Sequence, residues 1–373
     1  MKALIFTMTC GEGHNMLAKS ISQAFESKNI QTKIVQTFGY NEKRVAQENK
    51  KFLWAIKRVP HIYSFFWNKI RKKNYFTNKL PYYVKNCLAY FKQEIENYNP
   101  DIIVCTHSYA SAVISYMKAN KMIENRIVTS TILFDFCLAP YWEHSINIDY
   151  IFQPLENTTK DLLKKGFNSE QIKTFGLPVR EDFYKPYNKK ELQKDLNIEP
   201  KFTILIIAGG NGLGKTLTLL KSIINKKLNI NIIVINGKNK KNLNKISTYI
   251  NKNNINNVIN LGFVDNVDKY MKVSDLIITR CGGNGISEIL ALQKPFIIRE
   301  KMILNENINK KMFIELGCAL GMKKIKDAGN LIQYLMENPE NYLKMIKNIE
   351  KIHKVNAAQN IVSFLIEKTK DEK

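Results

Sequence analysis

The chain is 373 residues long, 45% of them are hydrophobic, and its formal net charge at pH 7 is +24. This length allows two domains of ordinary size, each with its own core, and the apolar content favours a folded globular protein. No apolar stretch approaches the roughly eighteen residues of a membrane-spanning helix, and the first residues predict a strand instead of a signal peptide. Six scattered cysteines without a C-x-x-C pair indicate a reducing compartment, with neither disulfides nor a zinc site.

The chain opens with a predicted strand, KALIFTMT at residues 2–9, which leads through a glycine turn into an amphipathic helix. The turn, C-G-E-G-H at 10–14, contains Gly13 and ends at His14. A G-x-G-H match is a weak signal by itself, because many strand–helix connections need glycine.

A basic and aromatic stretch follows. Between Asn49 and Gln93 there are eleven Lys or Arg and twelve aromatic residues, but no Asp or Glu. Such interleaving is typical of a helix that lies in a membrane interface, and each basic residue near an anionic leaflet adds about 1 kcal/mol of attraction. Ordinary helix packing and nucleic-acid binding remain alternatives, although no nucleic-acid-binding module is visible. The residues expected at the membrane are Trp54, Phe65, Phe66, Trp67, Lys69, Arg71, Lys72 and Lys73.

Later strands of the first half end in polar residues. PDIIVCTHS at 100–108 ends near His107, and RIVTSTILFDF at 126–136 ends near Asp135. Ligands of doubly wound sheets bind beyond the carboxyl ends of the strands, so both residues are candidates for the site. The segment 181–201, which has two prolines before a charged stretch, predicts a linker.

The second half begins with a strand and glycine turn in which Gly209 to Thr216 fit G-x-x-x-x-G-K-[ST], the phosphate loop of ATP- and GTP-hydrolysing proteins. That class also needs a later strand that ends in an Asp to hold magnesium. Asp135 comes before the loop, and Asp275 precedes its strand. We therefore expect the turn to hold a nucleotide phosphate in a different architecture.

A third glycine turn lies in TRCGGNGISEIL at 279–290, after a buried strand. Gly282 and Gly283 allow a ligand to come close, and a helix expected to start near Ile286 directs its free N–H groups at that ligand. Glu288, in the first helical turn, can accept hydrogen bonds from a ribose diol, and Arg280 can lie against phosphate. An ordinary turn with solvated charges is the alternative for this segment alone.

Three such turns predict an α/β protein with two doubly wound, Rossmann-like domains that face a cleft, where ligands commonly bind. We place the first domain at residues 1–190; it contains the basic and aromatic stretch and is therefore expected on the side of the membrane and of any substrate that comes from it. The second domain spans 200–355, and a C-terminal helix at 356–373 packs back on the first.

Together these motifs resemble those of the processive diacylglycerol glucosyltransferases and monogalactosyldiacylglycerol synthases, cousins of the enzyme that adds N-acetylglucosamine to lipid I. The resemblance runs over nearly the whole chain and includes GEGHNMLAKSI at the start, DFCLAPYW at 135–142 and LIITRCGGNGISEILALQKPFII in the second half. It implies the GT-B fold, a UDP-sugar donor bound mainly by the second domain, and a lipid acceptor reached from the membrane.

The resemblance also assigns roles. Glu288 corresponds to the carboxylate on the UDP ribose, and His14 to the acceptor-side histidine. The turn beside the diphosphate corresponds to Gly209, Gly210 and Gly212. The residues that hold the uracil correspond to Phe263 and Val264. The sugar-binding residues correspond to Asn305, Glu306 and Asn309. The family usually has proline and glycine before the sugar-binding pair, where this chain has Ile303 and Leu304, and Asn305 replaces a Gln. These departures leave the identity of the sugar open.

The sequence thus predicts an inverting transfer of a hexose from UDP-glucose or UDP-galactose to diacylglycerol or a similar lipid. No D-x-D triplet is present, so we expect no metal and no cofactor; helix N-termini, glycine-turn N–H groups and Arg280 or a lysine would stabilise the diphosphate. His14 is the first candidate for the base, with Asp135 and His107 as rivals, and a purely structural role in the turn is the alternative.

The expected location is the cytoplasm, on the inner face of the cell membrane, at an anionic surface and without nucleic acid. Three other classes stay open. A UDP-sugar epimerase uses the same fold without a lipid, and a phosphate-loop hydrolase would use Lys215 and Thr216. A non-catalytic membrane-surface protein is the third.

Overall fold

The computed structural model describes residues 1–371 except 10–12, 60, 61, 63, 66, 68, 70–81, 208, 210, 211, 213 and 301–304. The chain forms two compact units. Unit 1 is built mainly from Met1–Glu181 and Lys354–Lys373, and unit 2 mainly from Asp182–Met302 and Glu306–His353. The first unit therefore ends before the expected residue 190, and it includes the C-terminal helix.

Within the described residues, unit 1 holds a six-stranded parallel sheet in the order β2-β1-β3-β4-β5-β6. Its strands are β1 (Lys2–Thr7), β2 (Gln31–Gln36), β3 (Ile102–Cys105), β4 (Val128–Ile132), β5 (Tyr150–Gln153) and β6 (Ile172–Thr174). Its helices are α1 (Gly13–Glu26), α2 (Glu42–Arg58), α4 (Tyr82–Tyr98), α5 (Ser108–Ala119), α6 (Thr159–Lys164) and α15 (Ala357–Asp371), with 3-10 turns η1 (Trp142–His144), η2 (Glu156–Thr158) and η3 (Ser169–Gln171).

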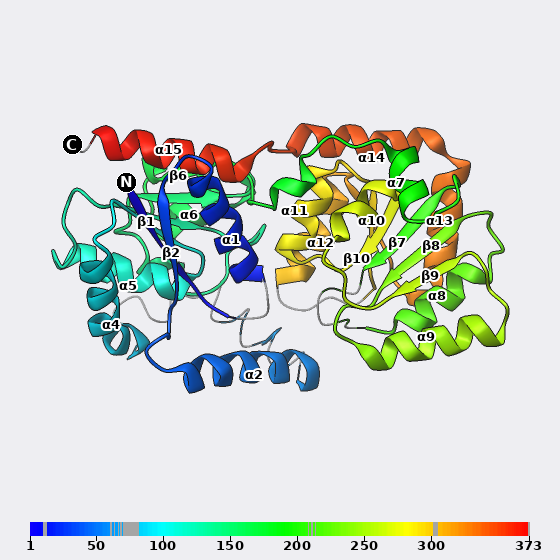
Figure 1. Cartoon of the computed structure of the whole chain (residues 1–373), viewed down its shortest axis with the longest axis horizontal. Coiled ribbons are helices and arrows are strands. Elements are labelled where there is room, and N and C mark those ends of the chain that lie inside the picture. Colours follow the sequence, from blue (N-terminus) through cyan, green and yellow to red (C-terminus); the bar gives the residue numbers. More distant parts are fainter. Residues whose placement is uncertain are drawn as a thin grey trace. The chain divides into compact units, whose positions relative to one another are not determined.

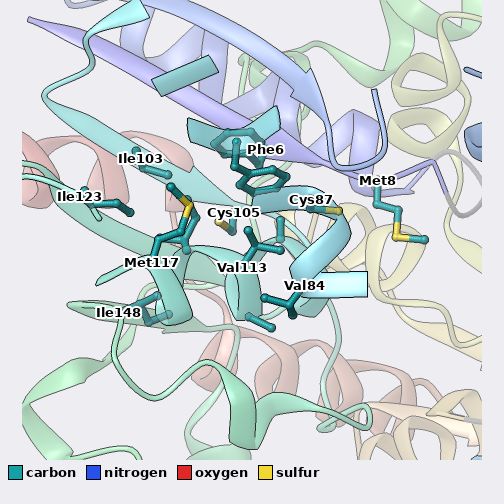
Figure 2. Packing of buried hydrophobic residues seen from close by; sticks show 14 of the residues in the cluster. Phe6, Met8, Val84, Cys87, Ile103, Cys105, Val113, Met117, Ile123 and Ile148 are labelled. Atoms are coloured by element: carbon teal, nitrogen blue, oxygen red, sulfur yellow. The ribbon is translucent and has the colours of Figure 1, made fainter. Parts of the chain in front are cut away.

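Helices cover both faces of this sheet (Figure 1), and β1 serves both because successive side chains of a strand point to opposite faces. On one face Phe6 packs with residues of α4 and α5, as Figure 2 shows around Phe6, Val84 and Val113. The ring of Phe6 stacks on that of Phe91, with centroids 4.0 Å apart. A central strand buried on both sides explains why its sequence is continuously apolar.

The other face is closed by α1 and α15, which lie side by side in Figure 1. Ile361 and Leu365 of α15 are fully buried against α1 and β1, in one cluster with Leu17 and Ile5. Phe364 adds an edge-to-face contact with Tyr150, at 4.8 Å between ring centroids. The last helix is thus part of the core of unit 1.

Unit 2 repeats the architecture, with a six-stranded parallel sheet among the described residues in the order β12-β11-β10-β7-β8-β9. Its strands are β7 (Thr203–Ile207), β8 (Asn231–Ile235), β9 (Val258–Leu261), β10 (Leu276–Thr279), β11 (Phe296–Ile298) and β12 (Ala319–Gly321). Its helices are α7 (Lys189–Asp195), α8 (Thr216–Ile224), α9 (Lys240–Lys252), α10 (Val267–Val273), α11 (Gly283–Ala291), α12 (Asn305–Glu315), α13 (Ala328–Glu337) and α14 (Pro339–Ile352); η4 (Glu181–Phe183) and η5 (Ile325–Asp327) are 3-10 turns.

The segment 181–201, predicted to be a linker, is largely folded as part of unit 2. Its helix α7 packs on α10. Asn188 caps the helix by accepting hydrogen bonds from the backbone N–H groups of Lys190 and Glu191, and Gln193 is buried. The N-cap and the buried face of α7 stabilise a helix in this segment, and the prolines that predicted a linker do not prevent it.

Candidate active site

Each sheet reverses its strand order at one point, between β1 and β3 in unit 1 and between β7 and β10 in unit 2. In doubly wound sheets, ligands bind beyond the carboxyl ends of the strands at such a point. Each unit therefore offers one edge for a ligand, and the predicted site residues can be located on these two edges.

His14 follows β1, near the start of α1, and the backbone that follows β3 holds its ring. Its Nδ1 lies 2.5 Å from the carbonyl oxygen of Thr106. Burial lowers the pKa of His14 to about 4, although the hydrogen bond with Thr106 acts in the opposite direction. Because a carbonyl oxygen can only accept, Nδ1 of the neutral ring carries the proton and Nε2 keeps a lone pair. This is the tautomer that a general base requires.

Gly13 leaves the space that this arrangement needs. A Cβ at Gly13 would lie 2.2 Å from Cζ of Phe134, so a larger residue would push this ring away. Phe134 also contacts the imidazole of His14, with ring centroids 4.2 Å apart. Gly13 and Phe134 thus fix the apolar surroundings that keep His14 uncharged.

His107 is the neighbour of His14, with ring centroids 4.7 Å apart in an edge-to-face arrangement. Its Nδ1 accepts a hydrogen bond of 3.0 Å from the backbone N–H of Tyr109 and so caps α5. Burial, together with the nearby His14, holds the pKa of His107 well below its usual range. The Nδ1 lone pair of His107 is already used by the cap, which leaves the protonated Nε2 as a donor. His107 is therefore the weaker candidate for the base.

Asp135 lies after β4, the next strand along the sheet, and is 7% exposed. Its Oδ1 accepts a hydrogen bond of 2.8 Å from the backbone N–H of Phe136. The three predicted catalytic residues thus follow three neighbouring strands, and His14 and His107 are in ring contact.

The basic and aromatic stretch 49–93 divides into two parts. Trp54 is 59% exposed and Phe65 64% exposed, whereas Phe91 is fully buried. Lys69 is exposed and Trp67 half-buried. The predicted membrane residues Phe66, Arg71, Lys72 and Lys73 lie outside the described residues. The interfacial interpretation therefore applies only to the part before α4, and α4 itself packs as a core helix.

In the described part of the chain, none of the helices has the length and apolar character that crossing a bilayer requires.

In unit 2 the turn after β10 differs from the prediction. Helix α11 begins at Gly283, three residues before the expected Ile286, with Gly282 as its N-cap. The backbone N–H of Ile286 already donates to the carbonyl of Gly282 at 3.1 Å. The prediction that Glu288 lies in the first turn is wrong, because the glycines continue the helix. Glu288 is half-buried in the second turn.

Arg280 and Glu306, predicted to bind phosphate and sugar, form an ion pair with each other. Nη2 and Nε of Arg280 donate to the same oxygen of Glu306 at 2.6 and 3.2 Å. Asn309, also on α12, is fully buried and donates through Nδ2 to the carbonyl of Cys281 at 2.9 Å. Helix α12, which begins at Asn305, is thereby fastened to the turn after β10, with Gly282 beside the Glu306 carboxylate.

The glycine turn after β7 is described at Gly209 and Gly212, whereas Gly210 lies outside the described residues. Gly212 has a φ of +58°, and a Cβ there would lie 2.1 Å from the carbonyl oxygen of Asn236. Its own carbonyl accepts a hydrogen bond of 2.8 Å from Nδ2 of Asn239. Only glycine fits this conformation and this close approach, so the ends of β7 and β8 are joined there.

Phe263 and Val264 follow β9 at the far edge of the sheet. Phe263 is 58% exposed, and Nζ of Lys238 lies 5.9 Å from its ring centroid. An exposed ring of this kind is available to stack on a base. Asn236 connects this edge to the glycine turn, because its Nδ2 donates to the carbonyl of Leu261 at 2.9 Å.

One residue of this edge was not among the predicted ones. Arg299 follows β11 and is 2% exposed. Its Nη1 lies 3.5 Å from the hydroxyl of Thr216, the first residue of α8. A charged residue directly after the apolar run FII was the signal in the sequence, but its partner is distant along the chain.

The geometry does not favour the phosphate-loop alternative. The strands on either side of β7 are β8 and β10, and within the described residues they are followed by Asn236 and Arg280. Neither is a carboxylate that could hold magnesium beside the loop. The described residues also contain no cluster of three or more His, Cys, Asp or Glu suited to a metal ion.

Comparison with known proteins finds family matches to both halves of the chain. Residues 14–179 match the family described as monogalactosyldiacylglycerol (MGDG) synthase, and residues 203–362 match the glycosyltransferase family 28 C-terminal domain. A processive diacylglycerol beta-glucosyltransferase of Bacillus pumilus is 25% identical over 99% of this chain and 95% of its own length. The corresponding protein of Bacillus cytotoxicus is 27% identical over 98% of this chain and 93% of its own length. The two halves of the chain thus match two glycosyltransferase family models, and over its whole length the chain is similar to processive diacylglycerol beta-glucosyltransferases.

Solved structures share the GT-B fold of this chain. MurG of Acinetobacter baumannii has a TM-score of 0.66 at 14% identity, over 98% of this chain and all (100%) of its own. A UDP-GlcNAc 2-epimerase of Neisseria meningitidis, bound to UDP-GlcNAc, has a TM-score of 0.62 at 18% identity, with the same coverage of 98% and 100%. Because a UDP-GlcNAc 2-epimerase shares the fold with this chain, whose sequence relatives are named glucosyltransferases, the fold alone does not decide the reaction.

Proposed function

We propose that this glycosyltransferase moves a hexose from UDP-glucose or UDP-galactose to a hydroxyl group of diacylglycerol or a similar membrane lipid, with inversion at the anomeric carbon and without a metal ion. The names of the curated relatives support a lipid acceptor and a sugar donor. The observation that carries the mechanism is the neutral His14, whose protonated Nδ1 is tied to Thr106.

On the acceptor side, Nε2 of His14 takes the proton of the lipid hydroxyl as its oxygen attacks the anomeric carbon. The bond between that carbon and the diphosphate oxygen breaks, and UDP leaves with the electron pair. Attack from the face opposite the leaving group inverts the configuration. The half-buried His14 ring has a lowered pKa, so it is uncharged and ready to accept a proton at neutral pH. Asp135 is the rival base.

On the donor side, Glu288 accepts hydrogen bonds from the ribose hydroxyls, and Phe263 with Val264 holds the uracil. The glycine turn at Gly209 and Gly212 meets the diphosphate, and the N-termini of α8 and α11 direct free N–H groups to it. Asn305 and Glu306 face the sugar, and the buried Asn309 holds α12 against the turn after β10. Fixed dipoles and cations of this kind can stabilise a leaving diphosphate without a metal.

The exposed aromatics Trp54 and Phe65, with Lys69, support a peripheral position on an anionic membrane. We propose the cytoplasmic face of the cell membrane as the location, since UDP-sugars are the donors. No role for nucleic acid is proposed.

The decisive experiment incubates the protein with radiolabelled UDP-glucose or UDP-galactose and diacylglycerol in phosphatidylglycerol vesicles, with and without EDTA. We expect label in the lipid extract with one of the two donors, unchanged by EDTA, and a β-linkage from the α-configured donor by NMR. If control reactions without lipid released UDP at the same rate as reactions with lipid, this would contradict a lipid acceptor. Activity that disappears with EDTA would contradict the metal-free mechanism.

A UDP-sugar epimerase is the second candidate, because solved epimerases share the fold over almost the whole chain. Incubation of the protein with UDP-GlcNAc and no lipid tests it. A new UDP-sugar isomer detected by NMR would support the epimerase, and its absence alongside labelled lipid would exclude it.

A further inference from the structure

We propose that Arg299 binds the diphosphate of the donor nucleotide and supplies the positive charge that a metal ion would otherwise give. This inference rests on the proposed function, because it assumes a nucleoside diphosphate at the carboxyl edge of the unit 2 sheet. It concerns a residue that neither the motifs nor the resemblance assigned to the site.

The position of Arg299 places its head at the point where the strand order reverses. Its backbone N–H donates to the carbonyl of Thr279, the last residue of β10, at 3.0 Å. From there the side chain reaches the turn after β7, where Nη1 approaches the Thr216 hydroxyl. Arg299, the residue after β11, therefore contacts the end of β10 through its backbone and the start of α8 through its guanidinium, at the ligand-binding position of this kind of sheet.

The turn leaves room for this guanidinium. Gly214 has a φ of +111°, and a Cβ there would lie 2.8 Å from both Nη1 and Nη2 of Arg299. A side chain at this position would be strained by the backbone and would also displace the guanidinium. The backbone of the turn and the cation are thus in direct contact.

Arg299 has unused hydrogen-bonding capacity. Nη2 is buried and has no hydrogen-bond partner among the described residues. The carboxylate of Glu300 lies 3.7 Å from it, within ion-pair range but beyond hydrogen-bond distance. A buried charged donor without a partner costs free energy, so such groups need an explanation. An anion bound in front of Nη2 would provide the missing acceptor.

The start of α8 adds a second attraction for an anion. The helix is nine residues long and begins at Thr216, next to the guanidinium. Its N-cap, Lys215, makes no side-chain hydrogen bond to the helix. The first N–H groups of a helix and the positive end of its dipole favour phosphate. The fork of an arginine matches two phosphate oxygens at once.

The other guanidinium described at this edge is already engaged. Arg280 donates to Glu306 through two nitrogens. Arg280 and Glu306 therefore largely neutralise each other, whereas Arg299 faces Glu300 only at longer range. A diphosphate carries more than one negative charge, so it can compete with a single carboxylate for the Arg299 fork. We therefore assign the diphosphate contact to Arg299 in preference to Arg280.

The test compares three ligands by calorimetry in EDTA, with no lipid present. Wild type, Arg299→Gln, Arg299→Lys and the control Arg126→Gln, a partly exposed arginine of unit 1, are titrated with UDP, UMP and uridine. We expect Arg299→Gln to weaken UDP binding about ten- to hundredfold, since hydrogen bonds to charged groups are at stake. Uridine binding should change less than about twofold, because uridine lacks the phosphates. Arg299→Lys should lie between, since it keeps charge but loses the fork.

Equal losses for UDP and uridine, or no loss for UDP, would overturn the proposal and leave Arg299 a structural residue. If Arg299→Gln does not fold, the UDP-to-uridine ratio of Arg299→Lys decides, because a structural role would leave that ratio unchanged. Failure of the proposed function is distinguishable: absence of label in the lipid extract would reject transfer to lipid, and absence of UDP binding in the wild type would reject the donor site. Unchanged UDP binding in a folded Arg299→Gln would reject only the diphosphate contact.

Discussion

In unit 1 the carboxyl edge of the sheet carries two imidazole rings whose pKa values are lowered by burial. In unit 2 the corresponding edge carries Arg280 and Arg299, two carboxylates, and the N-termini of α8 and α11. The two sheets reverse their strand order in the same manner, but the unit 1 edge carries two uncharged histidines and Asp135, whereas the unit 2 edge carries two arginines with their carboxylates.

This difference matches what the two halves of the proposed reaction need. A hydroxyl group must give up a proton, and a neutral imidazole in apolar surroundings accepts it without a competing charge. A nucleoside diphosphate must be held and its growing charge stabilised, and fixed cations and N–H groups do this. Each of the two sheets provides one ligand-binding edge, and the residues at the strand ends determine the chemistry of that edge.

The largest effect is expected from His14→Gln, which keeps a donor for the Thr106 carbonyl but removes the base. Turnover should fall about 10²–10⁴-fold, while the dissociation constant for UDP stays the same. The measurements are lipid glycosylation and calorimetry. His107→Asn is the matched control, because asparagine can still cap α5, and we expect it to lose far less. A larger loss in His107→Asn than in His14→Gln would reverse the assignment.

The pH dependence of stability should follow from the same edge. The pKa of His14 is about 4 in the folded protein and near its ordinary value when unfolded. The unfolded chain therefore takes up a proton first as the pH falls, so the contribution of neutral His14 is complete above about pH 6.5 and is lost towards pH 4. The loss is at most about 3 kcal/mol, less as water reaches the ring. His107 acts in the same direction.

Urea unfolding at a series of pH values between about 4 and 7 measures this. In His14→Gln the midpoint should fall less steeply with acid than in the wild type. Parallel curves for the two proteins would mean that His14 is not held neutral by the fold.

A smaller effect is expected at the charged edge. Glu288→Ala should weaken UDP binding about ten- to hundredfold, since the ribose hydroxyls lose a charged acceptor. Calorimetry against the exposed control Glu315→Ala, on α12, isolates the effect. Unchanged UDP affinity in the folded variant would remove Glu288 from the donor site and weaken the contrast between the edges.

The smallest effect per residue concerns the membrane side of unit 1. Replacing Lys69, Arg71, Lys72 and Lys73 with Gln should weaken binding to phosphatidylglycerol vesicles by about fivefold per residue that faces the lipid, and high salt should do the same. Trp54→Ala should weaken it as well, whereas Tyr334→Ala, an exposed aromatic of unit 2, should not. Sedimentation with neutral and anionic vesicles is the measurement. Equal binding to neutral and anionic vesicles would mean that these basic residues do not bind anionic lipid and only face solvent.

The central strands were predictable because strands buried on both faces are continuously apolar, as in ILII of β7 and LIIT of β10. Two strands were not predicted: β2, an edge strand with sequence QTKIVQ and two exposed positions, and the three-residue β12. Neither has the apolar run that makes a strand visible. Local sequence reports burial, and edge strands are only partly buried.

The site was predictable at the level of strand ends and less so at the level of contacts. His14 and Glu288 could be selected from their motifs, but the tautomer of His14 depends on Thr106, which is brought to it only by the sheet. The proposed role of Arg299 depends on its contact with Gly214, and no local sequence pattern connects these two distant residues. Similarly, α2 and α4 share a basic and aromatic composition. Only the stacking of Phe91 on Phe6 shows that α4 belongs to the core.

The packing of α15 against α1 has a consequence for how the protein is made. Residues 1–181 emerge from the ribosome long before Ile361 and Leu365, yet these two side chains complete the apolar face formed by Leu17 and Ile5. Domains usually fold in order as they are synthesised. Here the apolar face of unit 1 that α15 covers stays exposed until unit 2 has been translated. We therefore expect ribosome-bound chains that stop before residue 354 to be protease-sensitive in unit 1 and to bind chaperones that recognise apolar surface.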